Sequence, residues 1–208
     1  MTRFVSRRAV LAGATAVVAT SMLPLLSGCD APGAGGASSG GSFKGVDITG
    51  ANYAKGLQLK DVNGQMRTLA EFKGQVVFLF FGFTQCPDVC PTTMAELAEV
   101  RRRLGPDGEK VQGVFVTVDP ERDTPELLKG YLGSMDPSFV GLTGTPDEIK
   151  AAAKEFKVFY QKVPTQNGNY TIDHTAGAFV FDPSGQVRLF VRYGMPVDDL
   201  VSDIRQLL

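Results

Sequence analysis

The chain has few of the side chains that bind soft metals or carry thiol chemistry: its 208 residues include three cysteines and one histidine. A thiol or imidazole site must therefore draw on Cys29, Cys86, Cys90 and His174. The chain also has almost no net charge, since 21 basic and 22 acidic side chains sum to -1. A protein without an overall positive field does not attract nucleic acid over long range. We therefore expect no nucleic-acid partner.

The remaining composition is typical of a folded protein. Hydrophobic residues make up 43% of the chain, which is ordinary for a globular domain. Without the first forty or so residues, about 165 remain, and a domain of that size buries roughly 70% of its unfolded-chain surface. Neither a metal nor a disulfide is needed merely to fold it.

Residues 1–28 have the form of an export signal, with arginines followed by an apolar run from Ala9 to Leu26. The pair Arg7-Arg8 resembles a twin-arginine signal, but Val10 stands where an aromatic residue is usual, so the Tat and Sec routes both stay open. The ending Leu-Ser-Gly-Cys29 resembles a bacterial lipobox, which implies cleavage before Cys29 and lipid attachment to its sulfur. The alternative is an uncleaved anchor, because about 18 apolar residues can just span a bilayer. Both interpretations tether the protein to a membrane on its extracytoplasmic side.

Residues 29–42 are predicted to be a lipid-anchored flexible linker, since the glycine-rich and serine-rich run after Cys29 has nothing to pack. Its root-mean-square reach is of order 20 Å by the random-coil rule. Residues 43–208 then form the folded domain, which is held close to the bilayer.

The domain alternates strand and helix patterns before ending in an antiparallel pair and a last helix. The patterns predict a hairpin around Asn63-Gly64, a strand at 75–83 buried on both faces, helices at 92–104, 124 onward, 145–156 and 196–208, and strands at 111–118, 139–142, 177–181 and 187–193. This order indicates an α/β fold of thioredoxin-like type, in which helices flank a mixed central sheet. An N-terminal β-hairpin and an inserted helical segment are additions to that core.

Two cysteines spaced CxxxC, Cys86 and Cys90, follow the most apolar strand, and each precedes a proline. Because the residue before a proline avoids the α conformation, we expect Cys86 in a strand-to-helix loop and Cys90 near the helix cap, with Pro91 as the first helical residue. At that position the helix dipole would favour a thiolate on Cys90.

Three interpretations of this pair stay open. An inert disulfide or buried thiols would stabilise little, because the loop that they close is short. A redox dithiol fits the thioredoxin-like order, although the spacing is one residue longer than the usual CxxC. A metal site needs a third ligand, and the lone His174 lies just before a predicted strand, where a thioredoxin-like sheet brings it toward the cysteine loop. Two thiolates and one imidazole suit Cu(I) and can also hold Cu(II), whereas zinc would require a fourth ligand, for which Asp173 is a candidate.

Three separated segments resemble the Sco/SenC family of thioredoxin-fold copper proteins, which help to assemble the copper centre of cytochrome c oxidase. They are Phe83 to Pro91, Val118 to Pro125, and Asp173-His174-Thr175 followed by Phe179 to Gly185. The resemblance implies that Cys86, Cys90 and His174 are copper ligands, with Asp119 and Asp173 as candidates for a supporting role around the metal. Many members of the family carry a transmembrane anchor, from which the lipobox-like Cys29 departs.

We therefore expect a membrane-tethered copper metallochaperone whose partner is the copper-bearing oxidase subunit, with other copper chaperones or thiol-disulfide oxidoreductases as further partners. The alternative is a thiol-disulfide reductase that acts on cysteines of that subunit or of another exported protein. A peroxidase of the thioredoxin superfamily is disfavoured because the domain has no cysteine beyond the pair.

Overall fold

The computed structural model describes residues 42–208. The predicted export signal at 1–28, the lipidation candidate Cys29 and nearly all of the linker at 29–42 lie outside these residues. In the part of the chain that the structure describes, no helix is long and apolar enough to cross a membrane.

Ten strands, four α-helices and three short 3-10 helices make up the described residues. The strands are β1 Val46–Asp47, β2 Gln58–Asp61, β3 Met66–Thr68, β4 Val76–Gly82, β5 Val111–Thr117, β6 Val140–Thr143, β7 Tyr160–Pro164, β8 Tyr170–His174, β9 Gly177–Phe181 and β10 Val187–Arg192. The α-helices are α1 Val89–Leu104, α2 Pro125–Gly133, α3 Pro146–Glu155 and α4 Val197–Arg205. The 3-10 helices are η1 Leu69–Phe72, η2 Gly105–Lys110 and η3 Gln166–Gly168.

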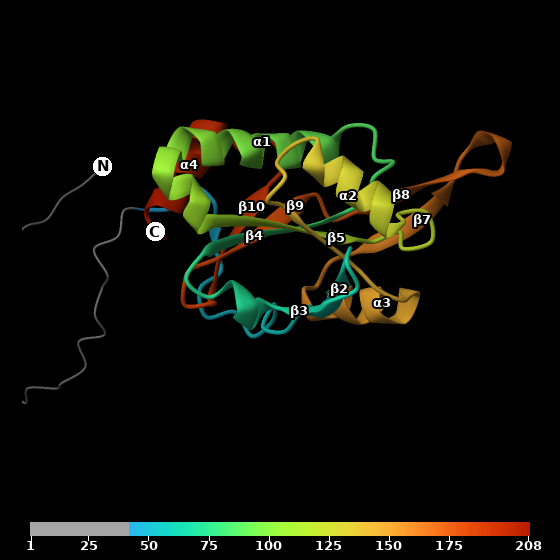
Figure 1. Cartoon of the computed structure of the whole chain (residues 1–208), viewed down its shortest axis with the longest axis horizontal. Coiled ribbons are helices and arrows are strands. Elements are labelled where there is room, and N and C mark those ends of the chain that lie inside the picture. The colour runs from blue at the N-terminus through green and yellow to red at the C-terminus, as the bar shows by residue number, and fades with distance from the viewer. Residues whose placement is uncertain (1–41) are drawn as a thin grey trace, which may run out of the picture. The chain divides into compact units, whose positions relative to one another are not determined.

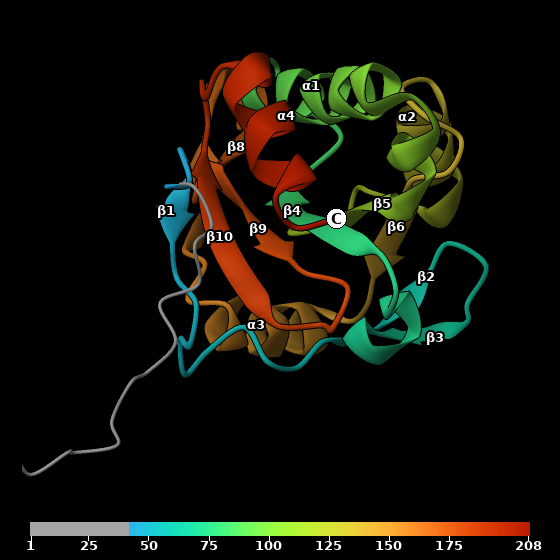
Figure 2. The ribbon, with the colours of Figure 1, turned by 90° about the vertical axis from the view of Figure 1, so that its left-hand side faces the viewer.

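Eight strands form one mixed sheet in the order β1-β10-β9-β4-β5-β6-β2-β3. Strand β4 pairs in parallel with β5 and antiparallel with β9, and β5 pairs in parallel with β6. Helices α1, α2 and α4 lie on one side of the sheet and α3 lies on the other (Figures 1 and 2). The expected thioredoxin-like sandwich, including the N-terminal β2-β3 hairpin, is confirmed.

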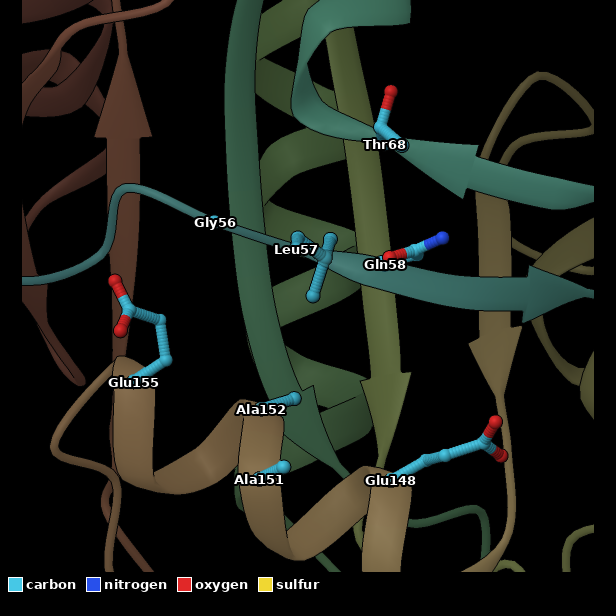
Figure 3. A pocket seen from close by; sticks show the side chains of 8 residues that line it. All are labelled: Gly56, Leu57, Gln58, Thr68, Glu148, Ala151, Ala152 and Glu155. Atoms are coloured by element: carbon cyan, nitrogen blue, oxygen red, sulfur yellow. The ribbon is translucent and has the colours of Figure 1, made fainter.

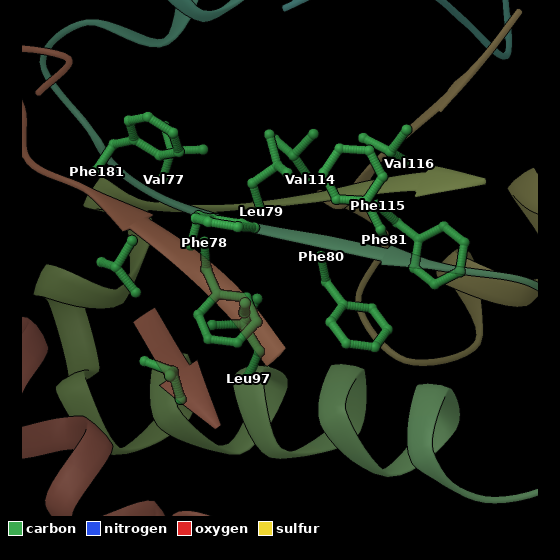
Figure 4. Close-up of a cluster of buried hydrophobic side chains, with 14 of the residues drawn as sticks. Val77, Phe78, Leu79, Phe80, Phe81, Leu97, Val114, Phe115, Val116 and Phe181 are labelled. Atoms are coloured by element: carbon green, nitrogen blue, oxygen red, sulfur yellow. The ribbon is translucent and has the colours of Figure 1, made fainter. Parts of the chain in front are cut away.

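Strand β4 is the centre of the core, and all seven of its residues are buried. Its side chains alternate between the two layers, so that Phe78 and Phe80 point toward α1 and Leu97, while Val77 and Leu79 point to the opposite side (Figure 4). Burying one such side chain is worth about 1.5–3 kcal/mol relative to leaving it exposed. The burial on both faces fixes β4 firmly, and its last residue stands immediately before the cysteine loop.

Local sequence signals placed most of these boundaries correctly. Thr124 caps α2 by accepting a hydrogen bond from the Leu127 amide, and Thr145 forms a capping box with Glu148 at the start of α3. Gly64 adopts φ 79°, the left-handed conformation that the turn between β2 and β3 requires. Each of these signals acts within a few residues, so sequence alone reveals it.

Two features differ from the expectation. Helix α1 begins at Val89, so Pro91 occupies the third helical position. A proline is tolerated there because the amides of the first turn have no partner within the helix. The strands β7 and β8, which form a separate two-stranded sheet, were not predicted.

A hollow of about 400 Å³ lies between β2 and α3 (Figure 3). Its two carboxylates already have structural tasks, because Glu148 belongs to the capping box and Glu155 accepts a hydrogen bond from the Lys55 amide at 2.9 Å. The thiols and the imidazole lie elsewhere, so this hollow offers no candidate chemistry.

Candidate metal centre

Three elements bring two sulfurs and one imidazole together. Cys86 lies in the loop after β4, Cys90 is the second residue of α1, and His174 is the last residue of β8. One ligand atom from each side chain lies within 4.8 Å of the others. The Cys90 sulfur is 3.4 Å from Nε2 of His174, and the Cys90 amide donates to the Cys86 sulfur at 3.4 Å. The juxtaposition that the sequence suggested is therefore present.

The end of β4 makes room for the Cys90 sulfur. Gly82 has no side chain, and a Cβ at this position would lie 2.9 Å from that sulfur and within 2.9 Å of the rings of Phe80 and Phe115. Such separations are well inside van der Waals contact, and the neighbouring atoms belong to fully buried side chains. Because this residue is glycine, the last residue of β4 can pack directly against the Cys90 thiol.

The imidazole is held with a defined nitrogen toward the thiols. Nδ1 of His174 lies 3.1 Å from the carbonyl oxygen of Thr175, which can only accept, so we assign the proton to Nδ1. Nε2 then presents its lone pair to Cys90. The rings of Phe80 and Phe83 meet the imidazole edge-on, with centroid distances of 5.7 and 5.9 Å. These contacts fix the ring plane before any metal binds, which is how outer partners commonly orient a ligating histidine.

The acidic thiol is Cys86, which corrects the expectation that Cys90 would be the thiolate. Hydrogen bonds from the Cys90 side chain, and then from the backbone amides of Asp88 and Cys90, lower the pKa of Cys86 to about 5 against the opposing effect of burial. The pKa of Cys90 is raised, first by its hydrogen bond to Cys86 and then by burial. The positive end of α1 thus acts on the loop sulfur that faces its amides, because the Cys90 sulfur points back into the core.

Asp119, the first candidate for a supporting role, lies under the hairpin that carries His174. Its buried carboxylate accepts from the Tyr170 hydroxyl at 2.8 Å and pairs with the Arg122 guanidinium. Arg122 in turn donates to the Tyr170 carbonyl oxygen at 2.8 Å, and its guanidinium carbon lies over the Tyr170 ring, 3.7 Å from the ring centre. Asp119 therefore anchors the base of β8 and does not contact the thiols.

Asp123 has a positioning role that the sequence did not suggest for it. The carboxylate is 1% exposed and accepts from the Thr84 amide at 3.0 Å and from the hydroxyls of Thr84 and Thr117 at 2.6 Å each. It thereby ties the loop before Cys86 to the end of β5. Asp123 lies in the Val118 to Pro125 segment that resembles the family, but a strand end followed by a helix cap explained those residues equally well.

Asp173, the second candidate, is exposed on β8 and lines a groove beside the thiols. Among residues 42–208, the one cluster of potential metal ligands consists of Cys86, Cys90 and His174, without a carboxylate. The structure therefore places Asp173 next to the site but not within the group of converging ligand atoms.

A family model described as SCO1/SenC matches residues 46–208, more than three quarters of the chain. The chain belongs to the SCO1/SenC family. An SCO2-like protein of Rickettsia felis is 40% identical over 131 residues, which are 62% of this SCO1/SenC chain and 64% of the relative. The chain thus spans a little under two thirds of the length of that curated relative.

Solved structures agree with this assignment. The copper-bound structure of ScoI from Bradyrhizobium japonicum is 42% identical with a TM-score of 0.67, covering 74% of this chain and 98% of the other. The solution structure of apo Sco1 from Thermus thermophilus is 41% identical with a TM-score of 0.70, covering 80% and 98% respectively. The architecture of this SCO1/SenC chain is therefore that of the Sco structures.

Proposed function

We propose that this chain is a membrane-tethered, extracytoplasmic metallochaperone that carries copper on Cys86, Cys90 and His174. Its client is the copper-bearing subunit of cytochrome c oxidase. The observation that carries the proposal is the convergence of two sulfurs and one imidazole nitrogen within 4.8 Å. The copper-bound ScoI relative supports the choice of metal.

The donor set fits copper as cargo. Two thiolates and one imidazole form a soft, low-coordinate site, which suits Cu(I) and can also hold Cu(II). Cys86 is already a thiolate at neutral pH by virtue of its lowered pKa. Cys90 must lose its proton when the metal binds, and the cation supplies the charge that favours this loss. His174 already directs Nε2 toward the thiols, 3.4 Å from the Cys90 sulfur, so the ring need not turn.

Release of the metal by ligand exchange requires that incoming ligands reach it. Cys86 and His174 are half-buried and border an open groove of about 270 Å³, whereas Cys90 is completely buried. Incoming ligands can therefore displace Cys86 or His174 first, while Cys90 holds the ion from beneath. The predicted signal at 1–28 would direct export, and a lipid on Cys29 would keep the domain near membrane-embedded clients.

Copper titration of the reduced full chain tests the assignment. We expect one Cu(I) per chain and a loss of at least tenfold in affinity for Cys86→Ser, Cys90→Ser or His174→Ala, because each removes one of three ligands. Cys29→Ser is the matched control, since Cys29 is not one of the three proposed ligands, and it should bind copper normally. Unchanged Cu(II) binding by His174→Ala would refute the assignment.

The anchor has its own experiment. Mass spectrometry of the exported protein should find an N-terminus at Cys29 that carries a diacylglyceryl group, and Cys29→Ser should lack that mass. Recovery of an unmodified Met1 would contradict the lipoprotein proposal and leave the metal site unaffected.

A second function, thiol-disulfide exchange, is favoured by the opposite acidities of the two thiols. The Cys86 thiolate would attack a client disulfide, and Cys90 would then resolve the mixed disulfide, leaving the client with two thiols and this chain with one disulfide. An external dithiol must afterwards reduce that disulfide. Reduction of a model disulfide should be abolished by either cysteine change and retained in His174→Ala, which separates this activity from copper binding.

A further inference from the structure

One buried polar group beside the candidate metal centre has no partner. Tyr131 lies on α2, one helical turn after the buried Leu128, so both side chains turn toward the sheet. The hydroxyl oxygen of Tyr131 has less than 1 Å² of accessible surface, and within residues 42–208 it has no hydrogen-bond partner. That surface is too small for contact with water. Buried tyrosine hydroxyls usually find a partner, so this one requires an explanation.

Tyr131 packs against a ring that also borders the Cys90 sulfur. The centre of the Tyr131 ring lies 5.6 Å from the centre of the Phe115 ring. The tip of the Phe115 ring and the Cys90 sulfur meet at Gly82, since a Cβ on that glycine would lie 2.9 Å from each. A phenylalanine at position 131 would fill the same space without burying an unpaired hydroxyl. The hydroxyl is therefore the part of this side chain that packing does not explain.

Electrostatics agree with this position. The pKa of the Tyr131 hydroxyl is raised first by burial and then by the charges of Cys90, Cys86 and Asp123, in that order. The raised pKa keeps the proton on the oxygen at neutral pH, so the hydroxyl can donate a hydrogen bond. The Asp123 carboxylate already accepts from Thr84 and Thr117. Of the charged groups around Tyr131, the Cys90 sulfur acts on it most strongly.

The Cys90 sulfur needs donors once it carries a charge. In the metal-free chain its pKa is raised first by the hydrogen bond to Cys86 and then by burial, and a hydrogen bond from the Phe83 amide opposes both. Metal binding removes the proton and leaves a thiolate enclosed by the core. A buried anion is unfavourable unless hydrogen-bond donors replace the water that it has lost.

We propose that Tyr131 donates a hydrogen bond to the Cys90 sulfur when that sulfur becomes a thiolate, and that it thereby acts as a positioning residue for the copper cargo. The inference rests on the proposed metallochaperone function and adds a group that holds its buried ligand. A protonated sulfur is a weak acceptor, so the two groups stay apart in the metal-free chain. A thiolate is a strong acceptor, and its charge draws the hydroxyl toward it.

Such a hydrogen bond favours Cu(I) over Cu(II). The sulfur carries more negative charge when the copper is reduced, so a donor stabilises the reduced form more. Hydrogen bonding around a ligating cysteine sulfur is one means by which proteins set the reduction potential of copper sites. Loss of the Tyr131 hydroxyl should therefore affect the two oxidation states unequally, which a purely structural role would not do.

Tyr131→Phe in the reduced full chain tests the proposal, because it removes one oxygen atom. Cu(I) affinity should fall by about tenfold to hundredfold, as expected for loss of a hydrogen bond to a charged group. Cu(II) affinity should fall less, so the reduction potential should become more negative. Tyr53→Phe is the matched control, since it removes a hydroxyl beside Lys157, just after α3 on the other side of the sheet, and should leave copper binding unchanged.

Two measurements without metal complete the experiment. Tyr131→Phe should raise Tm of the metal-free chain by about 2–4 °C, because an unpaired buried hydroxyl is lost. After oxidation of the Cys86–Cys90 pair, reduction by dithiothreitol should be about tenfold slower in the variant. The reagent thiolate attacks the accessible Cys86 sulfur, the disulfide bond breaks, and Cys90 leaves with the electron pair as the thiolate that the hydroxyl stabilises.

The two proposals fail separately. A wild-type chain that does not bind Cu(I), together with slower disulfide reduction in Tyr131→Phe, would refute the metallochaperone function and leave the hydrogen bond standing. Normal Cu(I) binding that Tyr131→Phe leaves unchanged would refute the hydrogen bond alone. A lower Tm with unchanged Cu(I) affinity and unchanged reduction potential would show that the hydroxyl serves packing, which would also overturn the proposal.

Discussion

Gly82→Ala tests whether the end of β4 creates the space for the candidate metal centre. The added methyl would lie 2.8–2.9 Å from Phe80, Cys90 and Phe115, about half an ångström inside ordinary contact. Overpacking a rigid core destabilises the folded protein by about 1–3 kcal/mol, whereas replacing glycine with alanine in a strand stabilises it by about 0.5–1 kcal/mol. We expect a net loss of about 1–2 kcal/mol because all three neighbours are fully buried.

Thermal and denaturant unfolding of the full chain measure this loss. For a domain of this size, 1 kcal/mol corresponds to about 2–4 °C, so Tm should fall by about 2–8 °C. Gly130→Ala is the matched control, since a Cβ there meets nothing within 4 Å and alanine favours the helix by about 1 kcal/mol. Because the Cys90 sulfur must shift, the Gly82 variant should also bind Cu(I) more weakly. A Gly82 variant as stable as the wild type would refute the packing argument.

Three further predictions follow from the site. The alkylation rate of Cys86, resolved by peptide mass spectrometry, should rise with pH and reach half its maximum near pH 5, because its pKa is lowered to about 5 and only the thiolate reacts. The alkylation rate at pH 7 alone is a poor test, since a thiolate of low pKa is also a weaker nucleophile. A pH profile with its midpoint near pH 9 would contradict the assignment of Cys86 as the acidic thiol. Asp123→Ala should destabilise by about 3–5 kcal/mol in urea unfolding, because three donors lose a buried charged acceptor; a loss below 1 kcal/mol would show that water replaces the carboxylate. Tyr170→Phe should cost about 1 kcal/mol through loss of the Asp119 hydrogen bond, and hydrogen exchange should quicken in β8 before it changes in β4; uniform exchange would argue against an anchored hairpin.

Much of the fold could be predicted because its signals are local. The continuous apolar run of β4, the Asn63-Gly64 turn and the caps at Thr124 and Thr145 each depend on a few neighbouring residues. The position of Cys86 outside a helix was also predicted correctly from Pro87. The start of helix α1 was predicted at Pro91, two residues after its actual start at Val89. The avoidance of the α conformation before proline was given more weight than the tolerance of a first helical turn for proline.

The site could be predicted only in part. The scarcity of soft ligands reduced the choice to a few residues, and the structure confirms that Cys86, Cys90 and His174 lie together. The supporting groups Asp123 and Arg122 were not predicted in their roles, because their partners Thr84 and Tyr170 are 39 and 48 residues away along the chain. Hydrogen bonds over such separations leave no pattern in a single sequence.

The sequence by itself determined the ligand inventory, the sandwich of strands and helices, and the placement of two thiols where a buried strand is followed by a helix. Only the tertiary structure decided which thiol is acidic, because this depends on which sulfur faces the amides at the start of α1 and which one is turned into the core. The tertiary structure also decided that His174 ends a separate hairpin. The strands β7 and β8 show no clear alternation of apolar and polar residues, and they form through their pairing with each other and the contacts of Arg122. Both outcomes depend on contacts between groups that are distant in the sequence. Burial and hydrogen bonding establish these contacts only in the folded chain.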